Sequence, residues 1–412
     1  MRTAAAEKLG IYVSFPFCRS KCTYCNFASG VYPASEHGRY VRRLVEELRD
    51  AGAWAAGMSA ALPRAVDSLY FGGGTPSLLD PAHVRELFVV LRGEYSVAKN
   101  AEITVECAPG QLSDATLEAF LEVGVNRISL GVQSFIDREA RESGRLHTRA
   151  VVLADLKRLR EAGIENVNID LIAGLAGQTL ASWQESLDVL LATGVSHASI
   201  YMLEVDEDSR LGSELLSGGA RYHAGLVPSD DTIATMYETA VQRLESAGIA
   251  QYEISNFARA GRESRHNLRY WQRRPYLGIG LDASSMLRAE GSEAYVLRAT
   301  TTGDLRAYLE ASEPPETAWL STERQQEEAW FLGLRLNGGV QLSAMRREFG
   351  GERVARALHA VERLEKRGLV SCDGKTVRLT ALGRLLSNEA FQEFLTGGAG
   401  EEELPERSVA AT

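Results

Sequence analysis

The chain has 412 residues, of which 45% are hydrophobic and 24% charged, the composition of an ordinary globular protein with two or three domains. Lys and Arg total 45 against 55 for Asp and Glu, so the formal charge of −10 disfavours nonspecific binding to nucleic acid. The opening MRTAAAEKLG lacks the apolar core of a signal peptide, and no later run approaches the roughly 18 apolar residues of a membrane helix. We therefore expect a cytoplasmic protein without a nucleic-acid partner.

Residues 10–15 (GIYVSF) predict a strand that leads into a cysteine-rich loop. Cys18, Cys22 and Cys25 follow with the spacing CxxxCxxC, and the basic residues around them favour thiolates. A structural zinc would need a distant fourth ligand, and chance clustering of structural thiols is a second alternative. The third is a 4Fe-4S cluster that leaves one iron without a protein ligand. The spacing and the polar context favour the cluster.

Strands and helices alternate after this loop. A helix is predicted over residues 36–51, and another begins at Ser113 and ends at Gly124 with the expected cap residues. Five further strands are predicted at residues 68–71, 102–106, 126–131, 166–172 and 197–203. Six β/α units are fewer than the eight of a closed TIM barrel, so the sequence predicts an α/β fold with an open (β/α)6 partial barrel.

Polar residues stand where the predicted strands end, which is where parallel barrels form their sites. FGGGTPS, at residues 71–77, has three glycines that allow a ligand close to the backbone, although a plain tight turn is the alternative. Glu106, Gln133 and Asp170 stand at or just after strand ends. Arg145 follows the fourth strand. A salt bridge explains any one of them alone, whereas four polar groups on one rim favour a polar ligand.

Segments along nearly the whole chain resemble the oxygen-independent coproporphyrinogen III oxidase-like radical S-adenosylmethionine (SAM) family, which includes the HemW-type heme chaperones. In order, they are YVSFPFCRSKCTYCNF, YFGGGTPSLL, ECAPGQL, RISLGVQSF, GRLHT, NIDLIAGLAGQT, YEISNFA, RHNLRYW and GLV…LTALGRLLSNEAF. The resemblance implies a 4Fe-4S cluster on three cysteines with SAM chelating its open iron. It also implies that SAM is bound by Tyr12, Gly74, Thr75, Glu106, Gln133, Arg145 and Asp170.

Two features separate the relatives within that family. Oxidases have a fourth cysteine two positions beyond the trio, where this chain has Phe27, and a long N-terminal extension, where about ten residues precede the first strand here. HNLRYW, at residues 266–271, is similar to the HNxxYW motif of the heme chaperones. That motif implies heme binding, with His266 as an axial ligand and flat aromatic area beside it. The alternative is a histidine hydrogen-bonded within a turn.

One segment departs from the family pattern. GIGLDASSM, at residues 278–286, stands where the family commonly has GxGAHS, so Ser284 or Ser285 replaces a usual histidine. Heme affinity or ligation is therefore expected to differ. His147, in GRLHT, also matches a family motif, for which a capping or structural role explains the residue as well as a catalytic one.

The resemblance and the element pattern together predict an open (β/α)6 radical SAM partial barrel with a C-terminal winged-helix-like α+β domain. The predicted divisions are the core at 1–250, a barrel-closing elaboration with the HNxxYW motif at 251–322, the winged-helix-like domain at 323–395 and a disordered tail at 396–412. The mixed charge of the third division argues against DNA binding.

The function implied by the resemblance is a carrier that binds heme and hands it to an acceptor protein, more than an enzyme. Flavodoxin or ferredoxin is the expected electron donor, and peripheral contact with a membrane is a further expectation. One alternative is an oxygen-independent coproporphyrinogen III oxidase, which decarboxylates propionate side chains. Another is a radical SAM enzyme with a different substrate.

Overall fold

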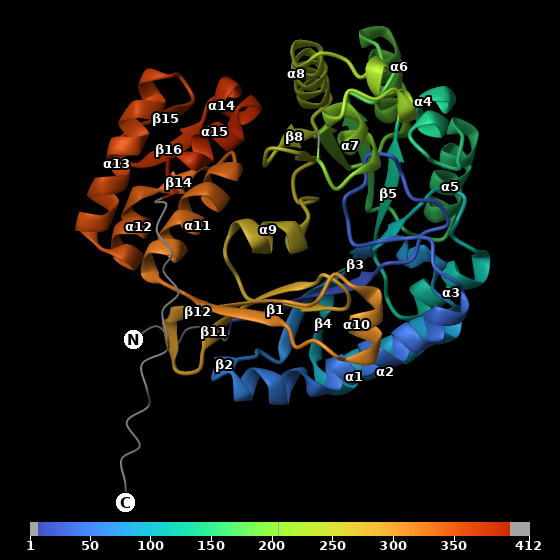
Figure 1. Ribbon diagram of the computed structural model, residues 1–412, viewed down its shortest axis with the longest axis horizontal. Coiled ribbons are helices and arrows are strands. Elements are labelled where there is room, and N and C mark those ends of the chain that lie inside the picture. The colour runs from blue at the N-terminus through green and yellow to red at the C-terminus, as the bar shows by residue number, and fades with distance from the viewer. Residues whose placement is uncertain (1–6, 205, 396–412) are drawn as a thin grey trace, which may run out of the picture.

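The computed structural model describes residues 7–204 and 206–395, in a large α/β unit and a smaller C-terminal unit (Figure 1). The tail predicted at 396–412 lies outside these described residues. The large unit is built on a 13-stranded sheet, and the small one on a three-stranded sheet. Within the described residues, no helix combines the length and the apolar character needed to cross a membrane.

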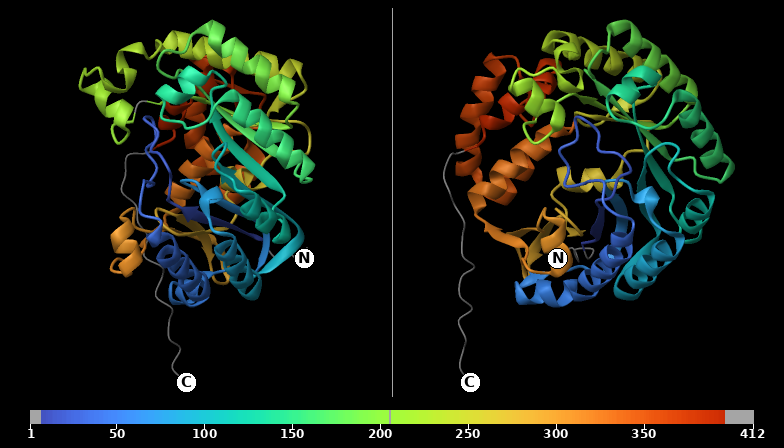
Figure 2. Two further views of the ribbon diagram at one scale, coloured as in Figure 1. Left: turned by 90° about the vertical axis from the view of Figure 1, so that its right-hand side faces the viewer. Right: turned by 45° about the vertical axis from the view of Figure 1, so that its right-hand side comes forward.

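Six neighbouring parallel strands form the centre of the large sheet, in the order β1-β3-β4-β5-β6-β7. They are β1 (Leu9–Phe15), β3 (Ala65–Gly73), β4 (Ser96–Cys107), β5 (Arg127–Gln133), β6 (Val167–Ala173) and β7 (His197–Met202). The main helices between them are α1 (Ser35–Gly57), α2 (Pro81–Glu94), α3 (Asp114–Glu122), α5 (Arg149–Glu161) and α6 (Leu180–Thr193). Figure 2 shows these helices around the outside of the curved sheet. The six predicted strands and the open parallel barrel are confirmed.

The two faces of each barrel strand have different partners. On β3, Phe71 points outward and stacks on Phe88 of α2, with ring centroids 5.4 Å apart. The neighbouring position, Tyr70, points inward and donates a hydrogen bond to Glu106 on β4. Successive side chains of a strand point to opposite faces. The apolar side chains therefore pack against the outer helices, and the polar side chains fill the barrel interior.

The segment after the barrel extends the sheet at both ends. Beyond β7 lie the short antiparallel strands β9 (Asn256–Ala258) and β8 (Ala250–Gln251). Beyond β1 lie the parallel β10 (Tyr276–Ile279) and then the antiparallel β11 (Ser284–Ala289), β12 (Ser292–Thr300) and β13 (Glu316–Leu320). In the described part of the chain, β8 and β13 end the sheet and do not pair with each other. The boundaries proposed at residues 250 and 322 remain predictions.

Helix α9 (Arg265–Trp271) connects the two ends of the sheet and contacts the interior of the barrel near the start of its strands. The backbone nitrogens of Arg265 and His266 donate to the carboxylate of Glu102 on β4, at 3.1 and 3.0 Å. The Nδ1 atom of His266 lies 3.0 Å from Ser68 Oγ on β3. The helix is therefore anchored to strands that precede it by more than 160 residues.

The C-terminal unit combines helices with a small antiparallel sheet ordered β14-β16-β15. Its elements are α11 (Thr322–Arg335), β14 (Val340–Gln341), α12 (Leu342–Phe349), α13 (Gly351–Lys366), β15 (Val370–Cys372), β16 (Thr376–Leu379), α14 (Ala381–Leu385) and α15 (Ser387–Gln392). Trp330 stacks on Phe394 at its centre, with centroids 4.8 Å apart, and Ile254 joins this core from the barrel segment. The helices with the β15–β16 hairpin give the predicted winged-helix-like α+β unit.

Candidate functional site

The cysteine loop joins β1 to α1, and backbone hydrogen bonds hold its two ends together. Cys18 N donates to Gly30 O, and Gly30 N donates to Pro16 O, both at 2.9 Å. The same loop is bonded to the glycine-rich turn after β3, because Gly74 N donates to Phe15 O and Thr75 N to Phe17 O, also at 2.9 Å. Residues predicted to hold a cluster and residues predicted to bind SAM therefore share one backbone network.

Each of the three thiols has its own polar partner. Cys18 Sγ accepts from Thr75 Oγ1 at 3.6 Å, Cys22 Sγ accepts from Arg145 Nη1 at 3.5 Å, and Cys25 Sγ lies 3.8 Å from Ser29 Oγ. Burial raises the pKa of Cys18, while the hydroxyls of Thr75 and Ser29 oppose that rise. Among the described residues, no three His, Cys, Asp or Glu side chains converge as the ligands of a single ion would. A cation and hydroxyl donors beside three sulfurs fit a group that is bound by thiolates.

Gly74 is where the glycine-rich turn meets the cysteine loop. A Cβ atom at this position would lie 2.8 Å from Pro16 C and 2.9 Å from the carbonyl oxygens of Phe15 and Phe17. These are backbone atoms, which cannot move aside without shifting the loop. The glycine is therefore required by the close approach of two backbone segments.

We expect Gly74→Ala to lower the free energy of unfolding by about 1–3 kcal/mol, because the methyl group overpacks against the loop backbone. We also expect less iron in the reconstituted protein. Gly93, at the end of α2, is the matched control, since a Cβ there meets nothing within 4 Å. Gly93→Ala should raise stability by about 0.5–1 kcal/mol. Urea denaturation and iron analysis of both variants check this, and equal behaviour of the two would contradict it.

Gln133 and Arg145 present unsatisfied polar atoms beside the cysteines. Gln133 has a φ of 71°, which is unfavourable for a residue other than glycine. In the described structure its buried Oε1 and the buried Nε of Arg145 have no hydrogen-bond partner. Arg145 Nη2 donates to Gly131 O, and a Cβ on Gly131 would come within 3.2 Å of both side chains. Strain together with unpaired buried polar atoms indicates a position that a polar ligand completes.

Two carboxylates lie deeper on the same rim. Burial raises the pKa of Glu106 to about 7, although the Tyr70 hydroxyl at 2.8 Å opposes the shift. Burial also raises the pKa of Asp170, against hydrogen bonds that include Ser129 at 3.2 Å and Asn168 at 2.7 Å. A charged ligand group near these carboxylates would favour their ionised forms.

Glu106→Gln should remove a pH dependence of stability. The folded-state pKa of about 7 lies above the ordinary 4.5, so the folded protein holds this proton more tightly than the unfolded chain. Stability is then fully present below pH 4.5 and falls as the pH rises to about 7, by about 3 kcal/mol in all. Urea denaturation between pH 4.5 and 8 should show this slope in the wild type and in the control Glu161→Gln, an exposed site. A Glu106→Gln protein with the wild-type slope would refute the assignment.

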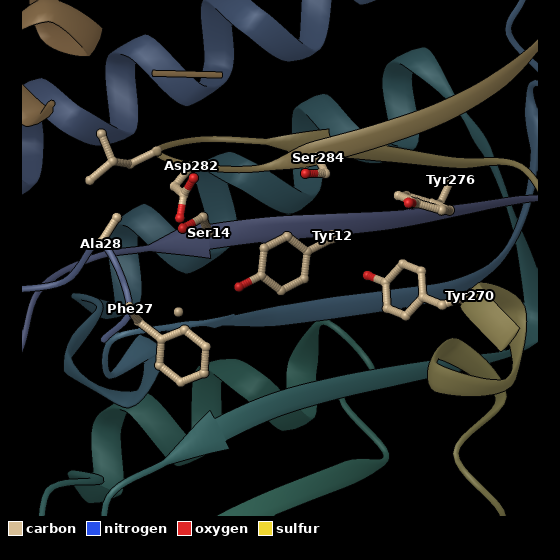
Figure 3. A pocket seen from close by; sticks show the side chains of 10 residues that line it. Tyr12, Ser14, Phe27, Ala28, Tyr270, Tyr276, Asp282 and Ser284 are labelled. Carbon is tan, nitrogen blue, oxygen red and sulfur yellow. The ribbon is translucent and has the colours of Figure 1, made fainter. Parts of the chain in front are cut away.

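An open cavity of about 360 Å³ lies next to the cysteine loop, between β1, α9 and the sheet extension (Figure 3). Its lining combines aromatic rings with hydroxyl and carboxyl groups: Tyr12, Ser14, Phe27, Ala28, Gly73, Tyr270, Tyr276, Leu281, Asp282 and Ser284. Phe27 is 65% exposed, so the cavity opens to solvent along the cysteine loop. Its volume is in the range of small-molecule sites.

The two serines in the departing segment have different positions. Ser284 lines the cavity, whereas Ser285 is buried on the other face of β11 and hydrogen-bonds Gly278 N at 2.9 Å. The side chain at position 284 therefore faces whatever the cavity binds.

The structure separates His266 from the cysteines. Its imidazole is 1% exposed, and both ring nitrogens have partners, Ser68 Oγ at 3.0 Å and Tyr270 Oη at 2.8 Å. Burial, with a contribution from Arg269, lowers the pKa of His266 to about 3. Ser68 lies five residues before Gly73 on β3, roughly 16 Å along the strand. Iron ligation by His266 would have to break these contacts, and that role stays a prediction.

The remaining predicted site residues lie around the cysteine end of the barrel. Tyr12 stacks on Tyr70 with ring centroids 6.0 Å apart and lines the cavity. His147 Nε2 donates to Val132 O at 3.1 Å, and burial lowers the pKa of His147 to about 4, which suits a structural role. Sequence reasoning missed Tyr276 as part of the cavity wall. Its signal was only a tyrosine at the start of a short apolar strand.

Comparisons with known proteins agree with this geometry. Residues 12–190 match the model of the Radical SAM superfamily, and residues 320–386 match the HemN C-terminal domain. The heme chaperone HemW of Bacillus subtilis is 32% identical over 392 residues, which cover 93% of this chain and 98% of that protein. The chain belongs to the HemW family. The family membership predicted from the sequence motifs is thereby confirmed.

More distant relatives extend the HemW comparison. The mitochondrial radical S-adenosyl methionine domain-containing protein 1 of Danio rerio is 30% identical, over 82% of this chain and 77% of that protein. The solved structure of coproporphyrinogen III oxidase (HemN) from Escherichia coli superposes with a TM-score of 0.79 at 23% identity, over 94% of this chain and 90% of that one. That structure supports the fold of this HemW-family chain and not a shared activity.

Proposed function

We propose that this chain is a heme chaperone that binds heme in the cavity beside the cysteine loop and passes it to an acceptor protein. The observation that carries the proposal is the lining of the cavity. Tyr12, Phe27 and Tyr270 offer flat aromatic area to a macrocycle, and the 65% exposure of Phe27 leaves a route for release. The near-full-length similarity to HemW supports the same function.

We propose that Cys18, Cys22 and Cys25 hold a 4Fe-4S cluster with SAM on its fourth iron. When bound, this pair supplies reductive cleavage of SAM to an adenosyl radical. The SAM-binding residues in this proposal are Tyr12, Gly74, Thr75, Glu106, Gln133, Arg145 and Asp170. Arg145 would balance thiolate charge through its contact with Cys22, and the unpaired Oε1 of Gln133 would accept a hydrogen bond from the ligand.

The partner of the cluster would be an electron donor such as flavodoxin or ferredoxin. Arg19 is exposed next to Cys18, and Lys21 lies in the same loop, so the rim offers positive charge to an acidic protein. A cytoplasmic location, peripheral contact with a membrane and transfer of heme to an acceptor protein belong to the proposal as well.

The test is an anaerobic titration of the reconstituted protein with heme, followed by Soret absorbance. We expect saturable binding of one heme per chain. Ser284→Trp, which fills the cavity, should weaken it at least tenfold, and Ser246→Trp, on the exposed end of α8 (Asp230–Ser246), should not. Absence of saturable binding in the wild type, together with SAM-dependent turnover of coproporphyrinogen III, would replace the chaperone with the oxidase.

A further inference from the structure

A directional series of hydrogen bonds begins at the buried guanidinium of Arg269. This side chain forms a salt bridge with Asp67 and donates from Nη1 to Lys8 O at 2.7 Å and Pro275 O at 3.0 Å. Its Nε points to Ser68 Oγ at 3.4 Å. A guanidinium has no acceptor atom, so the Ser68 oxygen accepts this hydrogen bond.

Ser68 is fully buried, and among the described residues His266 Nδ1 is the only acceptor within reach of its hydroxyl, so the hydroxyl hydrogen goes to His266. Ser68 Oγ lies 3.0 Å from His266 Nδ1, and with the hydroxyl as donor this nitrogen is the acceptor. A neutral imidazole carries its hydrogen on the other nitrogen, Nε2. That nitrogen lies 2.8 Å from Tyr270 Oη, so the tyrosine oxygen receives a hydrogen bond from His266.

Tyr270 is the end of this series and the only one of the four residues that lines the cavity. Figure 3 shows its hydroxyl directed into the cavity toward Tyr12. The Tyr270 oxygen accepts one hydrogen bond, from His266, and among the described residues it has no other hydrogen-bond partner. Tyr276 differs, because its oxygen is held by Arg298, which also pairs with Glu328 at 2.6 Å.

We propose that Tyr270 is the protein ligand to ferric heme iron in this cavity, and that His266 is a positioning residue that donates a hydrogen bond to the coordinated oxygen. The inference rests on the proposed heme-binding function. Burial raises the pKa of the Tyr270 hydroxyl, and a hydrogen-bond donor to the phenolate opposes that rise. Tyrosinate is an established axial ligand of ferric heme. The iron–oxygen bond forms as the phenolic O–H bond breaks, the proton leaves to water in the open cavity, and iron stays ferric.

The test is resonance Raman and absorption spectroscopy of the ferric heme complex of the full chain. The wild type should show an iron–phenolate vibration and a phenolate-to-iron charge-transfer band. Tyr270→Phe should lose both and bind heme at least tenfold more weakly. Tyr276→Phe, which removes the neighbouring cavity hydroxyl, should keep the band.

Variants of His266 separate positioning from ligation. His266→Ala should keep the charge-transfer band at a shifted energy, and His266→Gln, whose amide can donate to the same oxygen, should restore the wild-type energy. Added imidazole should have no effect on His266→Ala. A band that survives Tyr270→Phe, or a histidine-ligated spectrum that His266→Ala abolishes and imidazole restores, would overturn the proposal. Heme binding without the band also overturns it while leaving the chaperone function intact, and no saturable heme binding overturns both.

Discussion

Asp67→Ala is expected to lower the free energy of unfolding by about 3–5 kcal/mol, because it removes the partner of a buried charge. Arg269 has a side-chain exposure of 1% and Asp67 of 10%. Without the carboxylate, the guanidinium keeps only uncharged acceptors, which are the carbonyl oxygens of Lys8 and Pro275 and the hydroxyl of Ser68. The second cation, Arg274, which lies 3.5 Å from Asp67 in the wild type, remains nearby. Burial already lowers the pKa of Arg269, and Asp67 opposes that shift.

Urea denaturation of the wild type and the variant measures this loss. The matched control is Glu122→Ala, which breaks the pair with Arg85 at 2.7 Å, where both side chains are nearly half exposed. That change should cost much less than Asp67→Ala, because exposed ion pairs contribute little to stability. The double variant Asp67→Leu/Arg269→Met should be more stable than Asp67→Ala alone, since it leaves no buried charge without a partner. Similar losses in Asp67→Ala and Glu122→Ala would show that the burial of this pair is energetically irrelevant.

The barrel strands were predictable because each carries its own signal, a short apolar run followed by polar or glycine residues. The main miss was the start of β4, predicted at residue 102 and observed at Ser96. The extra residues include the exposed Lys99 and Asn100, which have no apolar alternation. This segment forms a strand because Ser96 and Val97 pair with Ala65 and Val66 of β3, before a register shift. Pairing with a distant strand cannot be predicted from the local sequence.

The site was predictable as a set of residues but not as an arrangement. The spacing of the cysteines and the strand-end positions indicated one rim, and the structure joins Cys18 to Thr75 and Cys22 to Arg145. The position of His266 in the fold could not be predicted from the sequence, because its partners on β3 and β4 lie more than 160 residues earlier. The motif indicated a histidine near heme, and the fold gives the cavity-facing position to the tyrosine four residues later.

Cys22→Ser is expected to abolish cluster assembly, with at least a tenfold fall in bound iron and sulfide. Cys22 is 8% exposed, and its sulfur is the one in contact with Arg145 at 3.5 Å. Serine keeps the size of the side chain and a hydrogen-bond acceptor, so the loop should still fold. What it loses is the thiolate, which is the ligand that iron–sulfur clusters require.

The matched control is Cys372→Ser, a partly exposed cysteine of β15 in the C-terminal unit, which should keep wild-type iron content. Iron and sulfide analysis, electron paramagnetic resonance of the reduced protein and release of 5′-deoxyadenosine from SAM measure the outcome. A site with three protein thiolates leaves one iron for SAM, so SAM should alter the resonance of the wild type. Zinc in place of iron, or a resonance that SAM leaves unchanged, would mean that the trio is a closed structural site, because such sites offer no open position.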